Sequence, residues 1–192
     1  MKAVSSLPLS AVLMSALFVV APVSAQQQVP VRPFDSVELE GGGHVTVKYG
    51  DVQSVRLLQG SLSYTKFVQE EPGKLRIEAC NGDCPHHYDL QVEITTPHIS
   101  GLAISGGGAI DSSGDFPSGH HLAVAIEGGG TIDARTINAT KAEAAINGGG
   151  VIKLRASDTL TAAVNGGGEI RYWGNPHVTS AIEGGGEINR GE

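Results

Sequence analysis

The residues best suited to bind a ligand are carboxylates and amides that recur at a nearly constant spacing. Glu127, Asn147, Asn165 and Glu183 each stand directly before a run of three glycines. If the chain repeats its path at that interval, the four side chains form a row on the outside of the molecule. Such a row could hydrogen-bond an extended glycan or a protein strand, or it could be structural, with stacked Asn side chains bonding one another. We take these four residues as the candidate binding site.

The only two cysteines, Cys80 and Cys84, flank the turn sequence Asn81-Gly82-Asp83. In an oxidising compartment two cysteines separated by a turn usually pair, so we expect a Cys80–Cys84 disulfide. The alternative adds His86 and His87 to make a tetrahedral zinc site. The spacing between these cysteines and histidines differs from that of the usual Cys₂His₂ zinc-binding motifs, and adjacent histidines usually point in different directions. We therefore predict no metal and no cofactor.

Carboxylates could also support catalysis on a polysaccharide, which requires paired acids that converge on a groove. Glu169, Glu183 and Glu187 are expected to cluster on one face near the C-terminal end. An exposed row of acids is more often only a solvated surface. No residue is assigned a catalytic role, and an enzyme remains the alternative hypothesis.

A repeated calcium site is excluded by the charges that follow the glycines. Asp111 and Asp133 occupy the position that a calcium-binding β-roll would use, but Lys153 and Arg171 occupy the equivalent positions in later repeats. Basic residues there would repel calcium.

The elements that position these residues follow from the glycine triplets, which begin at Gly41, Gly106, Gly128, Gly148, Gly166 and Gly184. Ile, Leu or Val stands two residues before and four residues after every first glycine. Period-two alternation on both sides indicates two short strands joined at a glycine corner. The pattern predicts an all-β fold, a single-stranded right-handed parallel β-helix (solenoid) of about eight short coils with glycine-rich corners. The coils are counted at Leu39, Leu57, Ile77, Ile104, Ile126, Ile146, Val164 and Ile182.

Residues 1–25 have one early Lys, an apolar stretch and small residues before Gln26, the pattern of a secretory signal peptide. We expect a disordered lead-in over 26–33 and one β-helix domain over 34–192. No other apolar segment is long enough to span a membrane. The formal net charge of −7 argues against a nucleic-acid partner. The mature chain is expected to be soluble and extracytoplasmic: periplasmic, secreted or on the cell surface.

Four features resemble the head GIN domain family of auto-transporter adhesins. They are the glycine triplets between strands, the signal-peptide pattern, the segment Val92-Glu93-Ile94-Thr95-Thr96-Pro97, and the closing Trp173-Gly174-Asn175-Pro176 with its later Gly184-Gly185-Gly186. The resemblance runs from about Phe34 to Asn189, although many members have Gly-Ser-Gly where this chain has three glycines. It implies a β-helical envelope or secreted protein and offers no catalytic residues to transfer.

The sequence thus favours a non-catalytic envelope module, adhesive in character, that binds glycan or protein along its coil faces. The alternatives are a polysaccharide lyase or hydrolase and a structural or assembly protein of the envelope. No cap is visible after the last coil. Either its charges (Glu183, Glu187, Arg190 and Glu192) blunt the open edge, or a second subunit covers it and makes a homo-oligomer.

Overall fold

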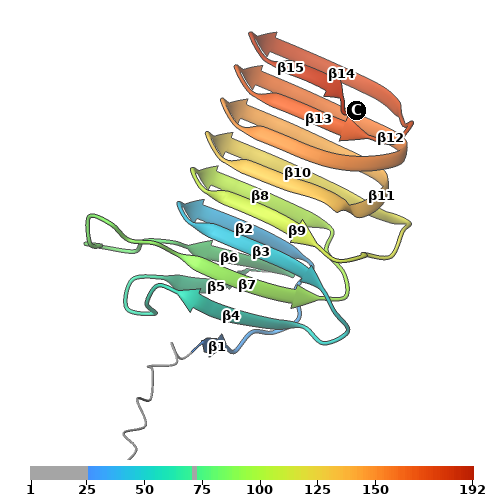
Figure 1. Ribbon diagram of the computed structural model, residues 1–192. Coiled ribbons are helices and arrows are strands. Elements are labelled where there is room, and N and C mark those ends of the chain that lie inside the picture. The colour runs from blue at the N-terminus through green and yellow to red at the C-terminus, as the bar shows by residue number, and fades with distance from the viewer. Residues whose placement is uncertain (1–25, 71–72) are drawn as a thin grey trace, which may run out of the picture.

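The computed structural model describes residues 26–70 and 73–192 and is all-β over that part of the chain (Figure 1). Fifteen strands join in one sheet of mixed parallel and antiparallel pairs, and the described residues contain no helix. The all-β prediction is confirmed. The predicted signal peptide over 1–25 lies outside the described residues.

Strands that precede and follow the glycine triplets form two layers. The pre-glycine layer contains β2 (Ser36–Gly41), β8 (Gly101–Gly106), β10 (His120–Gly128) and β14 (His177–Gly184). The post-glycine layer contains β3 (His44–Tyr49), β9 (Ala109–Ser113), β13 (Glu169–Trp173) and β15 (Glu187–Arg190). The long strands β11 (Thr131–Gly148) and β12 (Val151–Gly166) run through both layers. They join the layers into one sheet that nearly closes around the core.

Residues at equivalent positions of successive repeats pair in parallel register. Ile126 lies beside Ile146, which lies beside Val164, and Ile132 lies beside Ile152. Their side chains point between the layers and are almost completely buried, as alternation predicts. The two aliphatic columns beside the triplets therefore form the core. In the last repeat, however, Ile182 is 46% exposed.

Each glycine of a triplet has a different role at the corner. Gly148 has a φ of +132°, and a Cβ there would lie 2.3 Å from the Gly128 carbonyl oxygen. A Cβ on Gly150 would lie 2.7 Å from Cγ2 of Ile126, whereas one on Gly149 would meet nothing within 4 Å. In this triplet the first glycine is needed for its backbone conformation and for space, and the third for space alone. In the first two triplets the third glycines, Gly43 and Gly108, also have a positive φ. The fold does not require glycine at the middle position.

The N-terminal end differs from the predicted array of coils. The strand that contains Leu57, β4 (Ser54–Gln59), runs antiparallel to β7 (Gln91–Thr96) instead of forming a coil. The strand that contains Ile77, β6 (Lys74–Glu78), does align with β2 in parallel, but on the side away from β8. It also pairs antiparallel with β5 (Lys66–Glu70). The count of about eight coils is therefore wrong, because six repeats carry triplets and Leu57 lies on an antiparallel strand instead of in a stacked coil.

The expected disordered lead-in is also corrected. Residues 26–33 contain β1 (Gln27–Val29), which pairs antiparallel with β4. The polar residues Gln27 and Gln28 do not show the alternation of apolar and polar side chains that predicts a strand. The strand exists because β4 offers a free edge whose backbone groups need partners.

Candidate functional site

The predicted polar row lies on the outer surface of the pre-glycine layer. Glu127 pairs in register with Asn147, Asn147 with Asn165, and Asn165 with Glu183. All four are exposed, and adjacent members are separated by the inter-strand spacing of about 4.8 Å. Within the described part of the chain, none of the four side chains is hydrogen-bonded to another residue. Their amide and carboxylate groups are thus free to bond a ligand.

A column of alanines runs beside this row, two residues earlier on each strand. We call it the alanine groove, and it consists of Ala103, Ala125, Ala145, Ala163 and Ala181. Two adjoining hollows of about 360 and 330 Å³ lie over it and share Ala125, Ala145 and Ala163. The second hollow is also lined by all four members of the polar row. The groove therefore has an apolar floor and a polar wall.

The other wall of the groove contains Ala123, Glu143 and Thr161, which pair in register. With Glu127 and Glu183 opposite, both walls carry carboxylates. The groove runs across the strands, along the direction in which the repeats stack.

The alanine groove was not among the predicted sites, although the sequence contains a signal for it. Alanine stands three residues before the first glycine in five of the six repeats, with Glu38 in the first repeat. These positions alternate with the buried column and so had to face outward.

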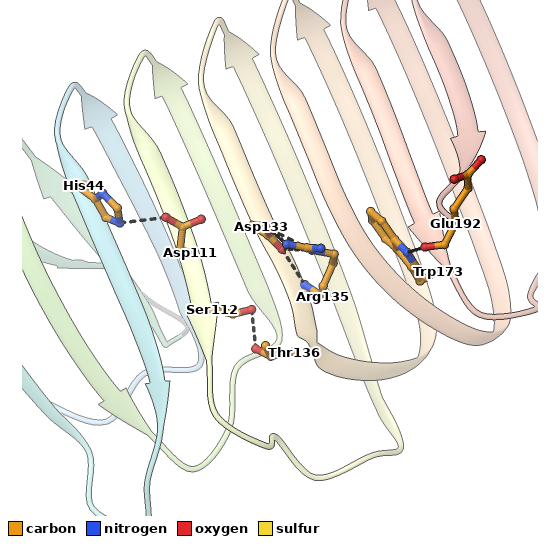
Figure 2. A network of polar contacts seen from close by, with 8 residues as sticks. All are labelled: His44, Asp111, Ser112, Asp133, Arg135, Thr136, Trp173 and Glu192. Carbon is orange, nitrogen blue, oxygen red and sulfur yellow. Dashed lines mark hydrogen bonds and ion pairs between the residues drawn. The ribbon is translucent and has the colours of Figure 1, made fainter.

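The outer surface of the post-glycine layer is different, because several of its charges are paired with one another (Figure 2). Nε2 of His44 lies 2.9 Å from a carboxylate oxygen of Asp111. The guanidinium of Arg135 donates hydrogen bonds to both carboxylate oxygens of Asp133 and lies 5.1 Å from the centroid of the Trp173 ring. The His44–Asp111 pair joins the first two repeats, whereas Asp133 and Arg135 lie two residues apart on β11.

The carboxylates considered for catalysis do not gather at one place. Glu169 pairs in register with Glu187 on the post-glycine layer, whereas Glu183 lies on the pre-glycine layer, before the corner. Glu169 is ion-paired with Arg171, and Glu187 accepts a hydrogen bond from Asn189. The expectation of a single acidic cluster is wrong, because the glycine corner separates Glu183 from the other two.

Glu93 has a perturbed pKa, and its side chain is only 7% exposed. Hydrogen bonding from Lys48, followed by that from Arg56, holds the pKa of Glu93 below its usual range, although burial opposes the shift. This ion triplet joins β3, β7 and β4. It fixes the N-terminal strands to the first repeat, far from the alanine groove.

Cys80 and Cys84 are joined by a disulfide, with their Cα atoms 6.1 Å apart. The bond leaves no thiolate for a metal. It closes the exposed loop that follows β6.

The continuous sheet and its repeated corner define an all-β protein built on a sequence repeat, with an open groove on one layer. A family described as "putative auto-transporter adhesin, head GIN domain" matches residues 33–121 and 118–176, and the chain belongs to that family. No curated protein matches the chain.

Two of the solved structures that match the chain are described as adhesion proteins. A putative adhesin from Bacteroides fragilis is 15% identical, with a TM-score of 0.54 over 86% of this chain and 95% of its own. A putative cell adhesion protein from Clostridium sporogenes is 13% identical, with a TM-score of 0.45 over 86% and 97%. The similarity to the Bacteroides fragilis structure supports the overall fold of this chain.

Among the residues that the structure describes, there is no helix of the length and apolar character needed to cross a membrane.

Proposed function

We propose that this protein is a non-catalytic adhesion module of the cell envelope that binds an extended glycan in the alanine groove. The observation that carries the proposal is a flat apolar floor beside four regularly spaced polar side chains that have no bonds within the protein. The C–H faces of sugar rings would pack on the alanines, and the hydroxyls would bond Asn147 and Asn165. The adhesin family and the signal-peptide pattern support an extracytoplasmic location. Winding of the six repeats as a right-handed parallel β-helix is part of the same proposal.

A glycan fits this surface better than a protein strand does. Added strands bind through backbone groups at the edge of a sheet, whereas the groove crosses the middle of a layer whose backbone groups already pair between repeats. The carboxylates of Glu127, Glu143 and Glu183 would repel a polyanion. The favoured ligand class is therefore a linear glycan that is uncharged or carries amines.

The test is a glycan array followed by titration of any positive oligosaccharide. Ala145→Trp fills the floor of the groove and should weaken binding at least about tenfold, equivalent to about 1.4 kcal/mol. Val151→Trp is the matched control, because Val151 belongs to the same repeat but faces outward from the other layer. Equal loss in both variants, or no glycan bound by the native protein, would contradict the proposal.

The alternative of a polysaccharide lyase or hydrolase makes a different prediction. Product would form on incubation with a bound glycan, and Glu169→Gln or Glu183→Gln would abolish its release. We propose instead that binding occurs without turnover, because these two carboxylates lie on different layers and Glu169 is held by Arg171.

A further inference from the structure

The outer edge of β14 is the least protected edge of the sheet. Among the described strands β14 pairs only with β12, so its other side presents a row of unpaired backbone groups. It is 8 residues long, whereas the other terminal strands, β1, β5 and β15, have 3, 5 and 4 residues. Short edge strands resist pairing with another chain, and β14 lacks that protection.

The core side of β14 is also unprotected. Val178, Ser180 and Ile182 are the register partners of Leu160, Ala162 and Val164. Val164 is 2% exposed, but Ile182 is 46% exposed because no strand follows it in the stack. The neighbouring edge strand, β15, is protected against pairing by an inward-pointing charge.

On β15, Arg190 pairs with Tyr172, which pairs with buried Leu154, so Arg190 occupies a core-facing position. A charge that points inward from an edge strand discourages further pairing. The chain therefore protects β15 and leaves β14 open.

We propose that β14 pairs antiparallel with β14 of a second copy, about a two-fold axis at Ser180. Directly opposite residues in an antiparallel pair share a face, which restricts the allowed registers. With Ser180 facing its own copy, Val178 lies opposite Ile182 of the second copy on the core side. On the outer side, Thr179 lies opposite Ala181 of the second copy.

The same register places His177 opposite Glu183 of the second copy. Because the pairing is symmetric, this contact occurs two times in the dimer. A two-fold interface must be self-complementary, and this strand meets the condition in shape and in charge. The other end of the stack is closed by the antiparallel strands β1, β4 and β5. Pairing through β14 therefore gives a closed dimer and not a filament.

The proposal is tested by placing one cysteine on the axis. The native cysteines are bonded to each other, so an introduced thiol would be the only free thiol in the described chain. Ser180→Cys should form a covalent dimer under mild oxidation, because opposite Cβ atoms lie about 4.5–5.5 Å apart. Ala181→Cys is the matched control and should remain monomeric, because residue 181 faces residue 179 of the second copy.

Light scattering provides a second measurement that does not depend on cysteine variants. The native protein should show a concentration-dependent dimer, and Ile182→Lys should be monomeric. Its melting temperature should match that of the native protein at concentrations too low for the dimer to form. The lysine is tolerated because Ile182 is already exposed in the single chain. A native protein that is monomeric at the highest concentration would overturn the proposal. Cross-linking of Ala181→Cys equal to or above that of Ser180→Cys would do the same.

Discussion

Replacing Gly148 with alanine is expected to destabilise the protein by about 2–4 kcal/mol. A side chain at a φ of +132° costs about 1–3 kcal/mol. The added Cβ would also lie 2.3 Å from the Gly128 carbonyl oxygen. That oxygen accepts a hydrogen bond from the Gly149 N–H at 2.9 Å, and moving it would cost about 1 kcal/mol more. Since a domain is stable by about 5–15 kcal/mol, the loss would be a large fraction of the total.

The matched control is Gly149→Ala, one residue along the same corner. A Cβ at Gly149 meets no atom within 4 Å, and its φ is not in the left-handed region. Its stability should stay within about 0.5 kcal/mol of the native protein, or rise slightly because alanine restricts the unfolded chain. Denaturant unfolding of the three proteins measures both differences. Equal effects of the two substitutions would refute our assignment of separate roles to the glycines.

Two further predictions concern the N-terminal strands. Glu93→Gln should cost about 2 kcal/mol at neutral pH, because Lys48 and Arg56 lose the buried carboxylate between them. The pKa of Glu93 is lowered by folding, so its stabilisation is present above the usual carboxyl pKa and is lost as pH falls through the lowered value. Unfolding measured against pH should therefore show native and variant proteins converging in acid, and a constant difference would count against the ion triplet. Reduction of the Cys80–Cys84 disulfide should cost less than about 3 kcal/mol, because it closes a loop with a separation of only 4 residues. A larger fall in stability on reduction, with the double Ser variant as reference, would mean that the bond holds more than its own loop.

The repeated part of the fold could be predicted because one rule applies in every repeat. Within an aliphatic column, each residue packs against the residues in the repeats above and below, so all of them are apolar. Ile126, Ile146 and Val164 can therefore be recognised as one column from the sequence. The polar row follows from the same register. Its position on the outside, beside the glycine corner, required no information beyond alternation and the interval between triplets.

The N-terminal region could not be predicted in this way because it is held by pairings that the repeat does not encode. Leu57 fits the spacing of the aliphatic column, yet it lies opposite Val92 on an antiparallel strand. Both arrangements bury the same side chain, so burial alone cannot distinguish them. The observed arrangement brings Glu93 into contact with Arg56 and Lys48 from two different strands, and the local sequence pattern does not predict these contacts.

A binding face built from repeats constrains how its affinity can be distributed. Ala125, Ala145 and Ala163 occupy equivalent positions on the floor of the groove, one in each successive repeat. Each should contact one segment of an extended ligand and contribute a similar free energy, unlike an interface in which a few residues dominate. Affinity should then rise in steps as an oligosaccharide lengthens, until it spans the alanines. A ligand whose affinity is already complete at one or two sugars would instead indicate a local pocket, and would contradict a role for the repeated groove.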